Sequence, residues 1–195
     1  MTNDDSIELI KKAFLPIKLN SFDHARFFEY WECVEFKKGD LITQQNQIER
    51  YFYVVETGIQ MIYLWDKNGE KKVIGFSFDG SFSGVYDSFV KERPSNYVLE
   101  ALSNSKLWRI NLSDFNRSYE LFPILEKWGR QVHLELLIGR VDREIELITT
   151  TAEERFTIFE ERCPAPLRQI PQKYIASYLN MTAETYSRLR KKSVS

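Results

Sequence analysis

The sequence predicts an α+β chain with an N-terminal double-stranded β-roll, one long helix and a C-terminal all-α helix-turn-helix. Short runs rich in Val, Ile, Tyr and Phe fill residues 33–110, and Gly-containing turns separate them, which is typical of strands. Apolar residues then recur at helical spacing over residues 123–150. Residues 169–192 have the pattern of short amphipathic helices joined by a tight turn.

These observations divide the chain into a roll with N-terminal helices at 1–122, the long helix at 123–150 and the helix-turn-helix at 151–195. Residues 4–30 are expected to be helical, with a break at Pro16. A length of 195 residues and a hydrophobic fraction of 43% are sufficient for a packed core. No apolar run approaches the roughly 20 residues that a membrane helix needs.

The beginning of the chain and its cysteines favour a cytoplasmic protein. The first residues, MTNDDSIELIKK, are acidic and then amphipathic, unlike a secretory signal peptide. Cys33 and Cys163 are far apart in the sequence and form no metal-binding spacing. We therefore expect reduced thiols, no cofactor and no membrane partner.

The predicted strands lie in the runs VEFKKGD, RYFYVVETG, IQMIYLW, KKVIGFSF and VLEALSNSKLWRI. Asn68-Gly69 stands between apolar runs and is a strong hairpin signal. Gly39, Gly58 and Gly80 mark further turns. Many short strands at this spacing favour a barrel or a double-sheet roll.

The helical part begins with a short helix in SDFNRSYELF, for which Ser113 is the expected N-cap. Pro123 then opens the long helix. One apolar stripe along it comprises Leu134, Ile138, Val141, Ile145 and Ile148. A second stripe comprises Leu125, Trp128, Val132 and Leu136. One stripe could cover the roll while the other meets a partner helix, so we favour a homodimer over a helix buried twice within one chain.

The C-terminal segment has the features of a helix-turn-helix. Ala176 is small where the helices would cross, Asn180 tolerates the left-handed backbone of the turn, and Thr182 can cap the second helix. The apolar face comprises Ile175, Leu179, Met181, Tyr186 and Leu189. The outer face comprises Ala183, Glu184, Thr185, Ser187, Arg188 and Lys191.

Charge supports a nucleic-acid partner locally rather than globally. The whole chain has 27 basic and 28 acidic residues. Residues 162–195, however, carry seven basic residues against Glu184 alone, a net charge of +6, which is typical of a DNA-binding module. The alternatives are a solvated tail and an αα-hairpin packed on a core. The expected DNA-binding residues are Thr182, Glu184, Thr185, Ser187, Arg188, Lys191 and Lys192.

This order of elements resembles the Crp/Fnr (cyclic-AMP receptor protein-like) transcription regulators. The resemblance is carried by KKGDLI and VVETGIQMIY in the roll, FDGSFSG before the ligand loop, and IPQKYIASYLNMTAETYSRLRKK. It implies a jelly roll of the cyclic-nucleotide-binding kind, a parallel dimer through the long helix, and a near-palindromic operator in double-stranded DNA. It also implies that Glu184 and Arg188 contact bases and that Thr185 contacts a base or a phosphate. RNA polymerase is a further candidate partner.

The ligand cassette departs from the family pattern. In the family, Phe-x-Gly-Glu supplies a glutamate for the ribose hydroxyl, and a later Arg-Ser/Thr-Ala supplies an arginine for the cyclic phosphate. Here FSGVYDSFVKERPSNY places Val85 and Ser95 at those positions, so the acceptor and the charged donor are missing. Arg93 comes two residues early and is restricted by Pro94. We expect no binding of cyclic AMP, and either an unknown small effector or none.

A candidate effector pocket is still expected around this segment. It comprises Phe82, Gly84, Val85, Tyr86, Arg93, Ser95, Asn96 and Tyr97.

Other function classes receive less support. An Fnr-type iron–sulfur sensor needs four cysteines, and this chain has two. A cupin-like enzyme needs clustered histidines, but His24 and His133 both lie outside the strand region. Neither a phosphate-binding loop nor a nucleophile elbow is present, so we predict no catalytic and no metal-binding residues. The remaining alternative is a ligand-binding or protein-interaction roll whose helical tail does not bind DNA.

Family members often continue into a β-hairpin wing, whereas this sequence ends at Ser195, so either this branch lacks the wing or the sequence is cut before it. For a module without the wing, DNA affinity is expected to depend more on dimerisation and on Lys191 and Lys192.

Overall fold

The structure is a computed structural model and describes residues 24–194. The described residues form two compact units, one containing 24–62 together with 76–131, and the other containing 63–75 together with 132–194. Most of the helical segment expected at 4–30 lies outside the described residues, and its described part contains α2 (His24–Phe28). Our three-part division of the chain stays a prediction.

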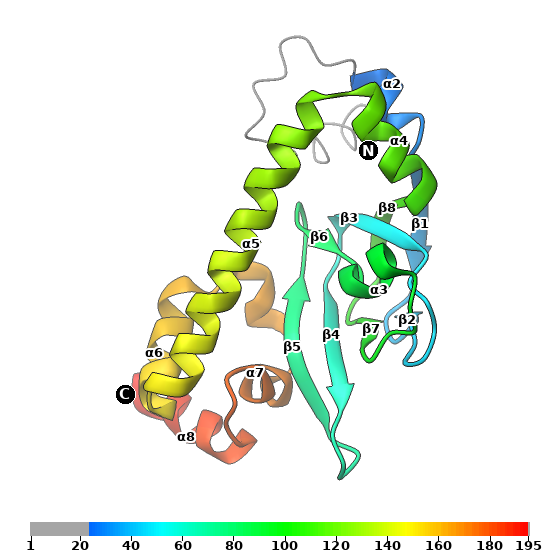
Figure 1. Cartoon of the computed structure of the whole chain (residues 1–195). Helices are drawn as coiled ribbons and strands as arrows, with labels where there is room; N and C mark the ends of the chain where they lie inside the picture. The colour runs from blue at the N-terminus through cyan, green and yellow to red at the C-terminus, as the bar shows by residue number, and fades with distance from the viewer. Residues whose placement is uncertain (1–23, 195) are drawn as a thin grey trace. The chain divides into compact units, whose positions relative to one another are not determined.

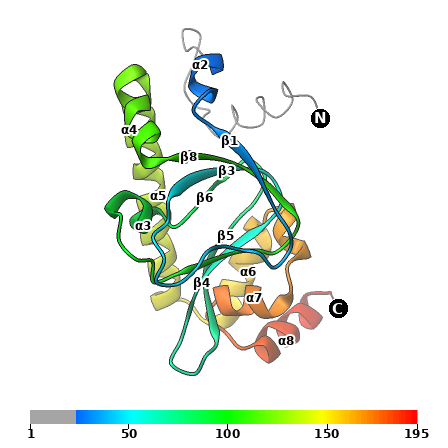
Figure 2. The same cartoon turned by 90° about the vertical axis from the view of Figure 1, so that its right-hand side faces the viewer.

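The strands form two four-stranded sheets that make up the predicted roll (Figures 1 and 2). The first sheet contains, in spatial order, β1 (Glu32–Phe36), β8 (Ser105–Asn111), β3 (Tyr51–Thr57) and β6 (Phe82–Ser83). The second contains β2 (Leu41–Thr43), β7 (Val98–Ala101), β4 (Gln60–Trp65) and β5 (Lys71–Ser77). The pairings β1–β8, β3–β8, β3–β6 and β2–β7 are antiparallel, so the predicted double-sheet architecture is confirmed.

Strand register follows the burial of alternating side chains. Val34 on β1 and Val55 on β3 both pair with Leu107 on β8, and Leu107 is fully buried. At the turn after β3, Gly58 has a φ of 108°, and an added Cβ would come within 2.3 Å of the Ser105 hydroxyl oxygen. Glycine is therefore required there both by the backbone angle and by the close approach of β8.

Two short helices of the first unit differ from the sequence prediction. The prediction missed α3 (Tyr86–Lys91), which lies inside the segment interpreted as a ligand loop. Helix α4 (Leu112–Leu121) was expected, but its N-cap is Asn111 rather than Ser113. The expected cap was wrong because Asn111 ends β8 in extended backbone, from which its side chain accepts a 2.9 Å hydrogen bond from the Asp114 amide.

The long helix α5 (Ile124–Thr149) begins directly after Pro123, as predicted. Its first turns pack into the first unit through Leu125 and Trp128, which are both buried. The rest of α5 belongs to the second unit. None of the helices in the described part of the chain is long and apolar enough to cross a membrane.

The second unit continues with α6 (Ala152–Arg162), the 3₁₀ helix η1 (Ala165–Gln169), α7 (Gln172–Tyr178) and α8 (Ala183–Val194). It also includes the β4–β5 hairpin over residues 63–75. The capping box of α6 is formed by Thr151 and Glu154, each of which bonds to the other's backbone amide. The core of this unit is apolar and comprises Phe156, Phe159, Leu167, Ile170, Ile175, Ala176, Leu179, Tyr186 and Leu189.

Candidate nucleic-acid interface and effector region

The turn between α7 and α8 is built as the sequence predicted. Asn180 has a φ of 52°, in the left-handed region. The amide of Met181 bonds to the carbonyl of Ala176 over 3.0 Å, and the amide of Asn180 bonds to the carbonyl of Ser177 over 3.0 Å. This is a Schellman motif with Asn180 as its left-handed residue, and it fixes where α7 ends.

Thr182 caps the N-terminus of α8, as predicted. Its hydroxyl oxygen accepts a 3.2 Å hydrogen bond from the Thr185 amide, and its carbonyl accepts the first helical bond from Tyr186. Glu184 lies in the first turn, where a bond from its own amide and one from the Thr182 hydroxyl lower the pKa of its carboxyl group. The N-terminal end of α8 therefore favours the ionised form of Glu184.

The outer face of α8 presents most of the predicted DNA-binding side chains to solvent. Tyr186 and Leu189 point into the core, whereas Thr185 and Ser187 are half-buried. The exposed residues of the predicted set are Thr182, Glu184, Arg188, Lys191 and Lys192.

Lys192 makes an additional contact that the sequence did not indicate. Its ammonium group lies 2.8 Å from a carboxylate oxygen of Glu153 on α6, and both side chains are exposed. The pair lowers the pKa of Glu153. Because exposed ion pairs are weak, Lys192 remains able to exchange this partner for a phosphate.

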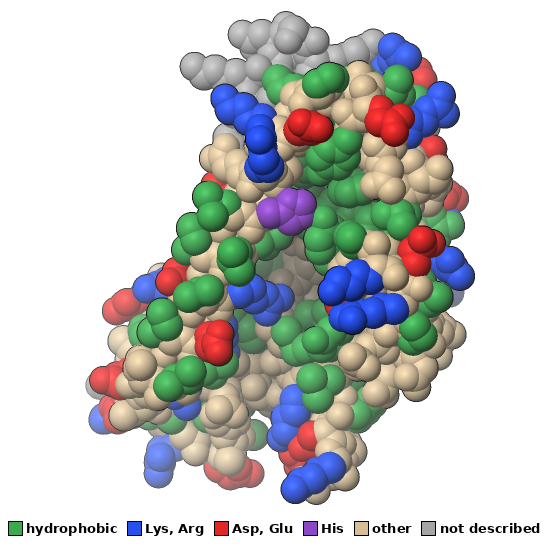
Figure 3. Space-filling model, in the orientation of Figure 1, with side chains coloured by type: hydrophobic (Ala, Val, Ile, Leu, Met, Phe, Trp, Pro, Cys, Tyr) green, Lys and Arg blue, Asp and Glu red, His purple; other side chains and the backbone are tan. Residues whose placement is uncertain are grey.

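The apolar stripe of α5 is uncovered along the second unit. Figure 3 shows hydrophobic side chains gathered along this helix. The exposed members are Leu134, Leu136, Leu137, Ile138, Val141, Ile145 and Ile148, with exposed fractions between 46% and 75%. They include the whole first stripe and Leu136 from the second. A contiguous apolar surface of this kind is typical of an interface.

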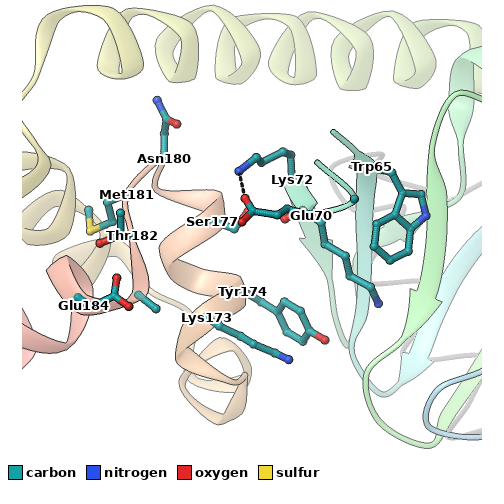
Figure 4. Close-up of a pocket in the computed structure, with 13 residues that line it drawn as sticks. Trp65, Glu70, Lys72, Lys173, Tyr174, Ser177, Asn180, Met181, Thr182 and Glu184 are labelled. Atoms are coloured by element: carbon teal, nitrogen blue, oxygen red, sulfur yellow. Dashed lines mark hydrogen bonds and ion pairs between the residues drawn. The ribbon is translucent and has the colours of Figure 1, made fainter. Parts of the chain in front are cut away.

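A groove lies between the β4–β5 hairpin and the helix-turn-helix, within the second unit (Figure 4). It has a volume of about 780 Å³ and includes Trp65 and Lys72 from the hairpin and Thr182 and Glu184 from the start of α8. The Ser177 hydroxyl bridges strand β5 and helix α7, since it donates to the Lys71 carbonyl and accepts from the Val73 amide, both over 3.0 Å.

Lys71 strengthens the hairpin contact through aromatic rings. Its ammonium group lies 4.3 Å from the ring centre of Tyr63 and 5.8 Å from that of Tyr174 on α7. The predicted hairpin at Asn68-Gly69 is confirmed, and its contact with the helix-turn-helix is a feature that the sequence did not reveal.

In the first unit, several of the predicted effector residues bond to partners within the fold. Val85 is buried, and the Ser95 hydroxyl bonds only within its own turn, to the carbonyl and the amide of Tyr97. Arg93 is exposed and pairs with Asp87 over 2.9 Å. Asn96 is exposed as well.

Aromatic packing accounts for other members of the same set. The ring of Phe82 stacks on Phe52 at 5.2 Å and meets the edge of Trp128 at 5.6 Å. Tyr86 approaches the same Phe52 ring at 5.9 Å. Gly84 has a φ of 120° and lies against the backbone of Tyr51. Of the predicted pocket residues, Phe82 and Tyr86 are thus brought together by core packing.

Glu49 is the residue of this region that the sequence analysis missed. It is 4% exposed, and its carboxylate accepts hydrogen bonds from the Thr43 hydroxyl and, over 3.1 Å, from the Tyr51 amide. It also accepts from the amides of Arg50 and Val85, and Val85 immediately precedes α3. Burial raises the pKa of Glu49 in spite of these bonds.

Tyr53 belongs to the same cluster. Its hydroxyl donates to the Glu49 carboxylate over 3.4 Å, and burial raises the pKa of this tyrosine. A single Glu after an unremarkable Gln-rich loop gave no sequence signal, because its role depends on the fold that surrounds it.

The described residues contain neither a metal-binding cluster nor a disulfide. No group of His, Cys, Asp and Glu in that part of the chain is arranged to hold a metal ion. Cys33 and Cys163 are both free thiols, and burial raises the pKa of each.

Comparisons with known proteins agree with this architecture. Residues 33–120 match the family model of the cyclic nucleotide-binding domain. The nitrogen fixation regulation protein FixK of Bradyrhizobium diazoefficiens is 24% identical over 193 residues, which cover 92% of this chain and 78% of FixK. The structure of FixK2 from Bradyrhizobium japonicum has a TM-score of 0.69 at 19% identity and covers 83% of each chain.

A further solved structure is the c-di-GMP-responsive global regulator CLP from Xanthomonas campestris. It has a TM-score of 0.68 at 16% identity, and the match covers 87% of this chain and 89% of that one. Residues 33–120 are thus similar to a cyclic nucleotide-binding domain, and the chain shares the fold of FixK2 and CLP. FixK and CLP are both regulatory proteins by name. The segment at the start of α3 lies within the part of the chain that matches this domain model.

Proposed function

We propose that this chain is a sequence-specific DNA-binding transcription regulator of the Crp/Fnr type that acts as a cytoplasmic homodimer. The observation that carries the proposal is the outer face of α8. Its exposed Glu184 and Arg188 stand opposite the buried Tyr186 and Leu189, so a rigid core presents them outward. A helix fixed in this way can enter the major groove with polar side chains directed at base edges.

The charges around α8 support the same partner. Arg188, Arg190, Lys191 and Lys192 follow one another along the exposed part of the helix. Phosphate contacts by such residues position a protein on the duplex without sequence preference. We assign the base contacts to Glu184 and Arg188, and the backbone contacts to Lys191 and Lys192, with Thr182, Thr185 and Ser187 on the same surface.

The uncovered stripe of α5 supports the homodimer. Ile138, Val141 and Ile145 are each about half exposed, at 51%, 46% and 52%. Their spacing of three and four residues is that of a coiled-coil seam. Pairing of this stripe with a second copy of the chain would place two recognition helices on one face, as a near-palindromic operator requires.

For the effector, we infer that the roll does not bind cyclic AMP. A ribose needs a hydrogen-bond acceptor, but Val85 has no carboxylate. A cyclic phosphate needs a charged donor, but Ser95 has no guanidinium and Arg93 is paired with Asp87. A different and less anionic ligand remains the candidate, and RNA polymerase is a candidate protein partner.

A selection experiment tests the proposal. The purified protein is mixed with genomic and random DNA fragments at several salt concentrations, and bound fragments are recovered by gel shift and sequenced. We expect fragments that share a near-palindrome and bind roughly a thousandfold more tightly than random DNA. If all fragments bind equally, or none binds, the roll with a helical tail that does not recognise DNA becomes the better description.

A further inference from the structure

The carbonyl groups at the end of α7 have an unusual set of partners. The carbonyl of Ile175 accepts from the Leu179 amide, and those of Ala176 and Ser177 accept from the Schellman turn. The carbonyls of Tyr178, Leu179 and Asn180 follow, and they have no place in that backbone pattern. Arginine side chains from two other helices bond to all three of them.

Arg155 on α6 supplies the first set of bonds. It is 9% exposed, and its Nε donates to the Leu179 carbonyl over 2.8 Å. One Nη donates to the carbonyl of Thr150, and the other lies 3.4 Å from that of Asn180. Among the described residues, no carboxylate forms an ion pair with Arg155. A buried cation bound only by backbone carbonyls is expensive to keep, unless it serves to fix the backbone segments that it joins.

Arg143 on α5 supplies the second set. It donates to the Tyr178 carbonyl, and its guanidinium lies 4.1 Å from the centre of the Tyr178 ring. Its side chain is 15% exposed and lies 3.8 Å from Glu146, which pairs with Arg162 of α6 over 2.9 Å. The planar fork of arginine is what allows it to bond a carbonyl and stack on a ring at once.

Arg143 lies on the side of α5 away from the apolar stripe. With 3.6 residues per turn, it is roughly 160° around the helix from Val141 and from Ile145. The helix therefore presents the proposed dimer seam on one side and holds the helix-turn-helix on the other. The α7–α8 turn sets the direction of α8. Through Arg143, this turn is connected to α5 and thus to the proposed two-fold axis.

We propose that Arg143 and Arg155 are positioning residues for DNA recognition, which clamp the turn at Tyr178–Asn180 to α5 and α6 and thereby set the half-site spacing that the dimer accepts. This inference rests on the proposed function. The clamp touches no DNA itself. It restricts the rotation of the recognition helices about the end of α5, and so makes the dimer selective for one separation of the half-sites.

The test uses the full chain and the operator selected by the wild type. The distance between the half-site centres is lengthened or shortened by one base pair, and the affinity for each duplex is measured by gel shift. The variants are Arg143→Met, Arg143→Lys and Arg155→Lys. Arg140→Met is the matched control, because Arg140 is an exposed arginine of the same helix. Affinity for an isolated half-site and the urea midpoint are measured for each protein.

The wild type and Arg140→Met should lose about tenfold or more in affinity when the spacing changes. Arg143→Met should bind the native spacing about tenfold more weakly than the wild type, which corresponds to the loss of one hydrogen bond made by a charged group. Its affinities for the three spacings should lie within about threefold of one another. Its affinity for an isolated half-site should be unchanged. Arg143→Lys keeps the charge but not the fork, and should restore the spacing preference in part.

A clamp that merely stabilises the fold would lower the urea midpoint and weaken binding to every duplex in proportion, with the spacing preference intact. That result overturns the proposal. Hydrogen exchange of residues 176–182 without DNA gives a second measurement, which should speed up severalfold in Arg143→Met and Arg155→Lys but not in Arg140→Met. Unchanged exchange in both clamp variants also overturns it. Failure of the proposed function is recognised separately, because the wild type would then select no operator.

Discussion

The carboxylate of Glu49 accepts a hydrogen bond from the backbone amide of Val85, the residue that the Crp/Fnr resemblance places at the position of a ribose-binding glutamate. The Glu49 side chain thus bonds to a backbone amide at the start of the ligand cassette. It is held there by Thr43 and Tyr51 as well, so it is part of the folded core and not a mobile side chain. An anionic ligand at this place would meet a carboxylate and no arginine.

Calorimetry with cyclic AMP and cyclic GMP should therefore show no binding tighter than the millimolar range, a binding free energy of about −4 kcal/mol. The physical reason is the lack of a charged donor at Ser95 and of an acceptor at Val85. Micromolar affinity would contradict this expectation. Arg93→Ala would then establish whether Arg93 leaves Asp87 to bind the phosphate, because loss of a true phosphate partner removes most of the affinity.

The stability of the roll should depend on pH through Glu49. Burial raises its pKa in the folded state, so between its ordinary pKa and the raised value the folded protein holds more protons than the unfolded chain. The free energy of unfolding contributed by Glu49 is thus highest at low pH and falls as the pH rises through this window. Glu49→Gln cannot titrate, so its stability relative to the wild type should increase from pH 4 to pH 8.

Urea denaturation at each pH measures this difference. Glu35→Gln, at an exposed carboxylate on β1, is the control and should track the wild type. A constant difference between Glu49→Gln and the wild type across the whole range would show that Glu49 does not titrate in this window.

Arg188→Ala should cost about 1–3 kcal/mol of binding free energy on the selected operator and relax specificity at one base pair in each half-site. Lys191→Ala should instead weaken binding to all sequences alike and reduce the dependence of affinity on salt, because it removes a phosphate contact. Gel shifts against the operator, point-substituted operators and random DNA separate the two behaviours. Equal losses on specific and random DNA in both variants would remove the base-contact assignment of Arg188.

Glu153→Gln should raise the affinity for random DNA and steepen its dependence on salt. The substitution removes the carboxylate that pairs with Lys192 over 2.8 Å, and so frees an ammonium group for phosphate. The urea midpoint should hardly change, because both partners are exposed. No change in DNA affinity would indicate that Lys192 lies outside the footprint.

Replacement of Ile138 and Ile145 by Glu should give monomers, since each helix of the proposed seam would then bury unpaired charge against its partner. Light scattering at micromolar concentration measures the mass. Arg140→Glu, on the same helix but off the stripe, should remain dimeric. A wild type that is monomeric under these conditions would refute the dimer model, whatever the variants do.

Local sequence patterns were sufficient to predict the double-sheet roll, the start of α5 and the geometry of the α7–α8 turn. Each depends on contacts between near neighbours. Strand alternation and turn glycines define the roll, Asn180 adopts the left-handed backbone, and Thr182 caps an amide three residues away. The apolar spacing on α5 likewise follows from the helix repeat alone. At the N-terminus of α4, both Asn111 and Ser113 could serve as the N-cap. Asn111 is the cap because it ends the preceding strand in extended backbone.

The tertiary structure alone decided the features that join distant segments. Glu49 meets Val85, Arg155 meets Leu179, and Ser177 meets the edge of β5 only because the chain folds back across many residues. No periodicity marks such residues, since the energy of a buried hydrogen bond depends on the partner that folding brings to it. The sequence by itself therefore predicted the double-sheet fold and the surface proposed to meet DNA. The three-dimensional arrangement determined that a carboxylate lies at the start of the ligand cassette and that two arginines hold the recognition turn.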